Sequence, residues 1–197
     1  MGPTNFFVRG VEIINLLEMV ISLEDDDNLH IGRLLILISD FSGKKLKNDI
    51  KGMTQLAKLD FFLRYPVYLE RAMEIQRIEN VELKISDFER RCVESRMVRY
   101  RFGPWDFKYR RLMNIMYSKG LIELTMEGRS VRIKVTSAGK EIAEKLSMDI
   151  SYQDIALRSD ILKKNFNMGG TKLKNFIYDH FSEIVTLEWG EHIEYEF

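Results

Sequence analysis

Apolar residues recur every three or four positions along most of this chain, a spacing that is typical of amphipathic helices. The segment from Leu29 to Phe41 is apolar almost all round, so we expect it at the centre of the core. The same spacing predicts further helices over Asn5 to Leu23, from Thr54 to the residue before Pro66, over Val67 to Arg77, from Asp106 to Lys119, from Thr136 to Leu146, over Gln153 to Phe166 and over Thr171 to Phe181.

Alternation of apolar and polar residues replaces the helical period in three places and predicts extended segments. The clearest is a two-stranded hairpin with one buried face, whose apolar residues flank a turn at 127–130: Ile122, Leu124, Met126, Val131, Ile133 and Val135. A short strand is expected over 81–85. Residues 98–102 alternate hydrophobic and arginine side chains, which predicts an extended segment with an aromatic face and a basic face, ended by a turn at 103–104.

Several helix starts carry capping residues. Ser86 and Glu89 have the spacing of a capping box, which should begin a short helix through Cys92. Further N-caps are expected at Thr54, at Asp106, and at Thr136 or Ser137. The run from Glu24 to Asp27 is expected to be a solvated acidic turn, because it lacks the alternating ligands and the glycine of a calcium loop.

The order of elements over 95–146 is helix, hairpin, helix, which is that of a winged helix. We therefore predict a mainly α fold with a small β hairpin (α+β), in which residues 1–150 form an elaborated winged-helix domain. The wing is expected at about 121–136 and an insertion at roughly Pro66 to Phe102. Residues 151–197 are expected to form a C-terminal helical extension and an acidic tail that pack on the same body.

The totals describe an ordinary globular chain. Thirty basic and 30 acidic residues give zero formal net charge, which argues against a protein that binds nucleic acid through bulk charge but not against a local basic patch. The single cysteine, Cys92, has no intrachain partner, as expected in a reducing compartment. No signal peptide or membrane span is visible, so we expect a soluble cytoplasmic protein.

The chain shows no recognisable catalytic set, so we predict that it is not an enzyme and that it holds no cofactor or metal. The three histidines are scattered, and none has metal-ligand spacing to another ligand. His180 lies on the apolar face of its predicted helix, which favours a core histidine. Met168 to Lys172 resembles a phosphate loop, but it lacks the full spacing and the preceding strand; a plain helix cap is the better interpretation.

The positive signal is local charge. From Arg90 to Arg111 the chain carries eight basic residues against two acidic ones, a net of plus six in a neutral protein. Arginines interleaved with aromatic residues could contact DNA phosphates, or they could pair with acidic surfaces of this protein or of a partner. Zero net charge favours partner binding. The candidate contact residues are Arg96, Arg99, Arg101, Trp105, Lys108, Tyr109, Arg110, Arg111, Arg129, Arg132 and Lys134.

Six segments give the chain a resemblance to a known family: Leu56 to Pro66, Met97 to Asp106 (MVRYRFGPWD), Tyr109 to Leu112, Gly120 to Ile122, Val135 to Gly139 and Lys172 to Tyr178. The resemblance extends over most of residues 29–190, and these segments carry it. The chain resembles the middle component of the ABC three-component systems, which include the Lamassu-type bacterial defence operons. The RYRFGPWD stretch is the more specific part, whereas the wing-helix part is shared by many winged-helix proteins.

The resemblance implies a non-catalytic subunit that bridges an SMC-like ATPase and an effector, often a nuclease. It would help to hold the effector inactive until foreign DNA is sensed, with possible double-stranded DNA contact and no membrane. Under this hypothesis Arg99, Arg101, Trp105 and Tyr109 either contact a partner or shape the loop, and Trp105 could instead plug the insertion against the core. The alternative is a winged-helix DNA-binding transcription regulator; no residue cluster supports a third hypothesis, an enzyme.

Overall fold

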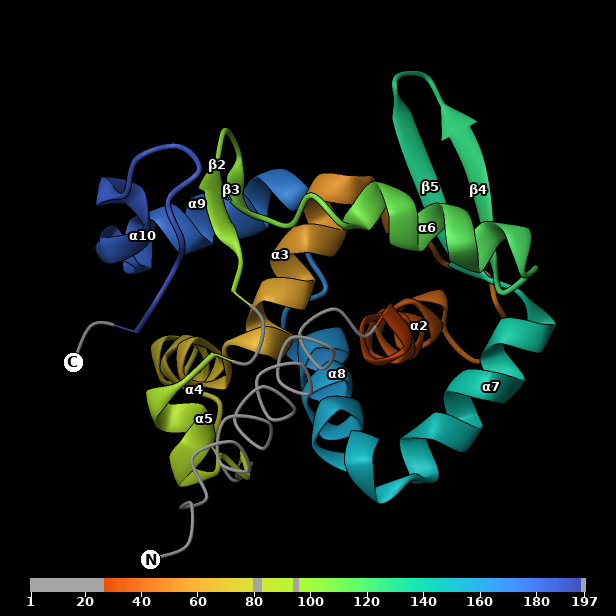
Figure 1. The fold of residues 1–197 in the computed structure, drawn as a ribbon, viewed down its shortest axis with the longest axis horizontal. Coiled ribbons are helices and arrows are strands. Elements are labelled where there is room, and N and C mark those ends of the chain that lie inside the picture. Colours follow the sequence, from red (N-terminus) through yellow and green to blue (C-terminus); the bar gives the residue numbers. More distant parts are fainter. Residues whose placement is uncertain (1–26, 80–82, 94–95, 196–197) are drawn as a thin grey trace, which may run out of the picture.

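The computed structural model of this chain describes residues 27–79, 83–93 and 96–195 (Figure 1). The helix expected over Asn5 to Leu23, most of the acidic turn after it, and the first half of the strand expected over 81–85 lie outside the described residues. Residues 83–85, the described part of that expected strand, do not form a strand.

Helix α2 (Asp27–Ser42) lies at the centre of the fold. Its residues Leu34 to Ile38 are at most 1 % exposed, because α7, α8, α6, α3 and the strand β5 surround it. The all-round apolar pattern therefore predicted this position correctly. In Figure 1 the helix is seen nearly end-on, with α8 and α7 below it and α6 above.

A three-stranded antiparallel sheet covers another side of α2, in the order β1 (Ile50–Lys51), β5 (Ser130–Val135) and β4 (Ile122–Glu127). The predicted hairpin is present, with Ile122 opposite Val135. The strand β1 was not predicted, because two residues after a basic connector carry no alternation. It is a strand because it pairs with β5, which places Ile50 opposite Ile133 and buries both.

Helix α3 (Met53–Arg64) follows β1, α6 (Tyr109–Ser118) precedes β4, and α7 (Ser137–Met148) follows β5. The Thr136 hydroxyl caps α7 by accepting a hydrogen bond from the backbone N–H of Gly139, as expected. The N-cap predicted at Thr54 is wrong: α3 begins after Gly52, whose φ of 95° few other residues adopt. Asp106 is not the N-cap of α6. Its carboxylate accepts a hydrogen bond from the backbone N–H of Lys108, the residue just before the helix.

A long segment separates α3 from α6. It contains α4 (Pro66–Ile75), α5 (Asp87–Arg91) and a second hairpin of β2 (Val98–Tyr100) and β3 (Gly103–Trp105). The capping box of Ser86 and Glu89 is confirmed at the start of α5. Residues 98–102 were expected to be extended and to end in a turn at 103–104. In the structure, residues 98–105 form two paired strands, with Val98 opposite Trp105.

The C-terminal part joins the same core. It comprises the 3-10 turn Ile150–Tyr152, α8 (Gln153–Asn165), α9 (Gly170–His180) and α10 (Ser182–Thr186). Ile161, Leu162 and Phe166 are at most 3 % exposed. The last described segment runs beside β2, where the backbone N–H of Ile193 donates to the Met97 carbonyl. Within the described residues, no helix is long and apolar enough to cross a membrane.

Candidate partner interface

Two hairpins flank helix α6 and define one face of the molecule. In Figure 1 the β2–β3 hairpin and the longer β4–β5 hairpin project in the same direction from either end of α6. Most of the candidate contact residues belong to these two hairpins and to α6.

Four aromatic side chains are exposed near the β2–β3 hairpin, and we call them the aromatic patch: Tyr100, Phe102, Phe107 and Trp189, which are 41, 49, 65 and 67 % exposed. The ring of Tyr100 is central, with ring centroids 5.8 Å from Phe107 and 6.4 Å from Trp189. Arg101 lies over the ring of Phe102, 5.3 Å from its centroid. Large exposed aromatic residues beside arginine are the composition of protein-interface hot spots.

The backbone brings these rings together from two parts of the chain, residues 100–107 and the segment around Trp189. Gly103 begins β3 with a φ of 112°, which allows the tight turn that leaves Arg101 and Phe102 at the tip. The C-terminal segment brings Trp189, because the N–H of Gly190 donates to the Arg99 carbonyl and the N–H of Arg99 donates to the Glu191 carbonyl, each at 2.7 Å.

Trp105 supports the patch from below. Its ring lies 6.2 Å from that of Tyr100 and packs edge-to-face on Tyr109, at 5.4 Å. Trp105 is only partly buried, so it links the exposed patch to the core. The interpretation that Trp105 shapes the loop fits this geometry.

Tyr109 belongs to a buried network of charged groups, which we call the Asp60 network. Asp60 is fully buried and accepts hydrogen bonds from Arg33 Nε at 2.6 Å and from the Tyr109 hydroxyl at 2.8 Å. Arg64 lies 3.7 Å from Asp60 and donates to Asp106 at 2.8 Å. Burial opposes ionisation of Asp60, but the Arg33 and Arg64 guanidinium groups outweigh it and hold the pKa of this carboxyl below its usual range. The network fixes the start of α6 against α2 and α3.

Two candidate contact residues lie inside the protein. Tyr109 is 0 % exposed and Arg99 is 8 % exposed, so their expected direct contact with a partner does not fit the structure. The alternation of residues 98–102 was recognised, but alternation cannot tell which face is buried. Here the arginine at position 99 faces inward, and the flanking aromatic side chain of Tyr100 faces solvent.

Four of the eight other candidate cations form ion pairs within the described part of the chain, because acidic residues fold next to them. The ion pairs are Arg96 with Glu194, Arg111 with Asp27, Arg132 with Asp49 and Glu127, and Lys134 with Glu123. Arg90 likewise pairs with Glu70. The predicted concentration of positive charge is therefore spread over several surfaces.

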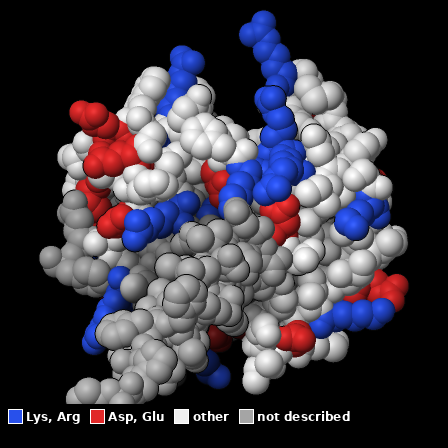
Figure 2. Space-filling model, in the orientation of Figure 1, with Lys and Arg blue, Asp and Glu red and all other residues white. Residues whose placement is uncertain are grey.

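Arg101, Arg110 and Arg129 are exposed and form no ion pair with any other described residue, and Lys108 is partly buried. Figure 2 shows Lys and Arg side chains gathered over the start of α6, with a few acidic side chains beside them. Helix α6 itself has no acidic residue, and its outer side forms a shallow depression of about 590 Å³ lined by Phe107, Arg110, Arg111, Asn114, Ile115 and Ser118.

Two of the four aromatic residues of the patch were missed from the sequence, whereas Tyr100 and Phe102 belong to the aromatic face expected over 98–102. Phe107 was not singled out because it lies outside the inward-facing stripe of the predicted helix, and Trp189 was assigned only to an acidic tail. Neither position has a local signal. Their importance follows from the backbone pairing that brings residues 189–193 to β2.

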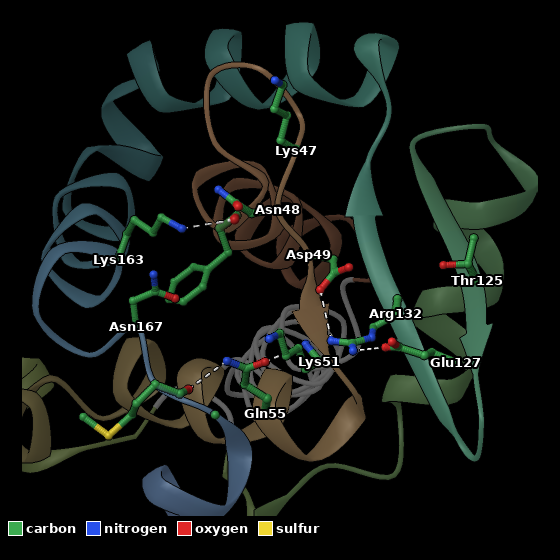
Figure 3. A pocket seen from close by; sticks show the side chains of 13 residues that line it. Lys47, Asn48, Asp49, Lys51, Gln55, Thr125, Glu127, Arg132, Lys163 and Asn167 are labelled. Carbon is green, nitrogen blue, oxygen red and sulfur yellow. Dashed lines mark hydrogen bonds and ion pairs between the residues drawn. The ribbon is translucent and has the colours of Figure 1, made fainter.

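A separate polar cavity of about 660 Å³ lies between β1, β5 and the end of α8 (Figure 3). Its wall is held by contacts within the chain: Gln55 donates to the Met168 carbonyl, and Arg132 lies between Asp49 and Glu127. Lys163 donates to the Phe41 carbonyl and covers the ring of that residue. Gly169 stands at the cavity edge as the N-cap of α9, as the helix-cap interpretation predicted.

The histidines do not form a site in the described part of the chain, where no group of three or more His, Cys, Asp or Glu residues could hold a metal ion. His30 is buried beside Arg33, and burial together with that guanidinium lowers its pKa to about 4. The expected core position of His180 is wrong: it lies at the exposed end of α9, with its ring 4.8 Å from that of Phe176.

Scans of this chain against protein-family models, curated proteins and solved structures found no match.

Proposed function

We propose that this chain is a non-catalytic adaptor subunit of an SMC-like ATPase defence complex, and that it docks through the aromatic patch. The kind of complex is what the sequence resemblance implies. In it, the chain would bridge the ATPase and a nuclease-type effector and help to hold the effector inactive. The observation that carries the docking role is the exposure of Tyr100, Phe102, Phe107 and Trp189.

Physical chemistry supports a protein partner for this patch. A fully buried aromatic side chain removes about 150–250 Å² from water, so four half-exposed rings leave a large apolar area that a partner could cover. Arg101 and Arg110 at its edge have no acidic partner among the described residues, which suits an acidic rim on the other protein. Phe107 and Trp189 already pack on Tyr100, so fixing these two rings on docking costs less entropy.

We propose further that the fold is an elaborated winged helix. The order α2, β1, α3, α6, β4, β5 with the sheet order β1-β5-β4 supports this assignment, with α6 as the helix before the wing and the β4–β5 hairpin as the wing. The insertion between α3 and α6 would then be the part that carries the docking hairpin.

Co-expression with an SMC-like ATPase of such a defence complex, followed by size-exclusion chromatography, tests the adaptor role. The wild-type chain should elute with the ATPase in at least one nucleotide state, and the double variant Phe107→Ser, Trp189→Ser should not. Phe88→Ser is the matched control, because Phe88 is 64 % exposed on α5, outside the patch. Failure of the wild-type chain to associate in every nucleotide state, or equal loss in the control, would contradict the proposal.

A second candidate function, DNA binding, is favoured by the outer side of α6. Arg110, Arg111 and Asn114 are exposed there without an acidic neighbour on the helix, and arginine and asparagine are residues that read base edges. Fluorescence anisotropy with labelled duplexes tests this function. Arg110→Gln and Arg129→Gln should each weaken binding and lower its salt dependence, and a chain that binds no duplex at low salt would eliminate this candidate.

A further inference from the structure

Three cationic side chains meet behind the β2–β3 hairpin without an acidic residue. Lys58 of α3 is 2 % exposed, Arg99 of β2 is 8 % exposed, and Lys174 of α9 is partly buried. The Arg99 guanidinium lies 5.2 Å from the ring centroid of Tyr178, and the Lys174 ammonium lies 5.4 Å from it. Within the described chain, none of the three forms an ion pair.

The hydrogen-bonding groups of this cluster are incompletely used. Lys58 can donate three hydrogen bonds, and it makes one to a described residue, to the Thr54 carbonyl at 2.9 Å. Arg99 Nε and the Tyr178 hydroxyl are buried and have no hydrogen-bond partner. A buried group left without its hydrogen bond normally destabilises the fold, and more so when the group is charged.

The aromatic ring of Tyr178 compensates for only part of the missing interactions of these cations. The ring attracts the nearby cations, but a ring face cannot complete the hydrogen bonds of Lys58, Arg99 Nε and the Tyr178 hydroxyl together. Burial and the neighbouring Lys174 lower the pKa of Lys58 to about 8, so the positive charges oppose one another. Clusters of buried cations are normally balanced by an anion.

We propose that Lys58, Arg99, Lys174 and the Tyr178 hydroxyl form a binding site for one phosphate-type oxyanion. Such an ion carries several strong acceptor oxygens, enough for the Arg99 Nε–H, the Tyr178 O–H and the two ammonium groups. Lys174 and Tyr178 are the partly exposed members, so the ion enters from the α9 side. The source is either free inorganic phosphate or the phosphate of a small phosphoester such as a nucleotide.

The site lies directly behind the docking hairpin. A Cβ placed on Gly103 would lie 3.7 Å from Cε of Lys58 and 3.8 Å from Cε1 of Tyr178, so both side chains lie against β3. A bound oxyanion would therefore hold β2 and β3 against α3 and α9. The proposal concerns a ligand of this chain alone, and it stands whether or not the adaptor role is correct.

Thermal unfolding of the full chain in increasing inorganic phosphate tests the site, with chloride at matched ionic strength as the reference. Above the dissociation constant, each tenfold increase in phosphate should raise the wild-type Tm by about 3–6 °C. Tyr178→Phe removes one hydroxyl and should weaken phosphate binding roughly tenfold. Lys174→Met and Lys58→Met should lose most of the response; Lys174 is partly exposed, so its variant should fold even if Lys58→Met does not.

Lys172→Met is the matched control, since Lys172 is exposed on the same helix and belongs to the stretch that resembles a phosphate loop. It should keep the wild-type response, because Lys172 is not part of the proposed site. Comparison between variants also cancels the general stabilising effect of phosphate on proteins. Titration with a nucleoside monophosphate distinguishes the source: a shift at lower concentration than with phosphate identifies a phosphoester, and an equal shift identifies the free ion. A wild-type chain that responds to neither, or responds no more than its Lys174→Met and Tyr178→Phe variants, would overturn the proposal.

Discussion

Helix α3 carries two buried charges, Asp60 and Lys58, that are two residues apart and so point to nearly opposite sides of the helix. On the Asp60 side, one carboxylate is matched by two guanidinium groups and a tyrosine hydroxyl. On the Lys58 side, two further cations approach, and no carboxylate does so among the described residues. One helix therefore separates a compensated cluster from an uncompensated one.

The difference shows what each side of α3 contributes. The Asp60 network is complete, so it stabilises one arrangement of α2, α3 and α6 and fixes the position of Trp105 through Tyr109. The Lys58 cluster lowers stability as long as its charges are unmatched, which is the behaviour of a binding site rather than of a core. Both clusters reach the β2–β3 hairpin, one beneath Trp105 and one beneath Gly103.

The largest expected effect is on the compensated side. Asp60→Ala should lower the free energy of unfolding by about 3–5 kcal/mol, because Arg33 and Arg64 would be left buried without their carboxylate. Urea unfolding measures the change. The control is Asp160→Ala, whose carboxylate is 51 % exposed and pairs with Lys164 four residues along α8, and which should change stability by no more than about 0.5 kcal/mol. Equal losses in the two variants would contradict the claim that the buried Asp60 network stabilises the fold more than an exposed ion pair does.

Lys58→Met should have the opposite sign. In phosphate-free buffer at pH 7 it should raise the free energy of unfolding by on the order of 2–3 kcal/mol, because it removes an unmatched buried ammonium. The pKa of Lys58 is about 8 in the fold and 10.5 without it, so the unfolded chain binds more protons between these values. Wild-type stability should therefore rise relative to the variant as pH increases from 8 to 10.5.

The measurement is urea unfolding of both proteins at pH 7 and pH 10.5. The gap between them should be full below pH 8 and close near pH 10.5. A variant less stable than the wild type at pH 7 would show that the Lys58 charge is compensated after all.

Tyr109→Phe should have a smaller effect, a loss of about 1–3 kcal/mol, because the variant withdraws one hydrogen bond from the buried Asp60 carboxylate. That hydrogen bond also helps to hold the pKa of Asp60 down, so its removal should move acid unfolding to higher pH. Circular dichroism during acid titration checks both. Tyr117→Phe, on the exposed side of the same helix, should match the wild type; a shift of equal size there would contradict the assignment.

The smallest effect is expected at the surface. Arg111→Gln breaks the ion pair with Asp27, in which the arginine side chain is 55 % exposed, and should cost less than about 1 kcal/mol. The cost should disappear in concentrated salt, which screens exposed pairs. A loss that persists in high salt would mean that Arg111 holds α2 and α6 together.

Several elements were predictable because their signals are local. The apolar run over residues 34–38 can be satisfied only by a surrounded helix, and α2 is surrounded. The Thr136 cap and the capping box of Ser86 and Glu89 depend on residues three apart, and both form as predicted. The β4–β5 hairpin follows from alternation on both sides of a tight turn.

Other features depended on partners far away in sequence. Strand β1 exists only because β5 pairs with it, and Trp189 joins the aromatic patch only because residues 190–191 bond to Arg99. Counting charges between Arg90 and Arg111 overestimated a surface patch, since Glu194, Asp27 and Glu70 come from elsewhere to neutralise part of it.

The sequence by itself determined the helices of the core and the β4–β5 hairpin, because hydrophobic period, capping and turn chemistry each depend on residues within a few positions. Only the tertiary structure decided which arginines are buried, paired or exposed, because charge compensation depends on distances through space. For the same reason, the segment over residues 98–106 presents Tyr100 and Phe102 to solvent and holds Arg99 against Tyr178 of α9, a division that alternation alone leaves open.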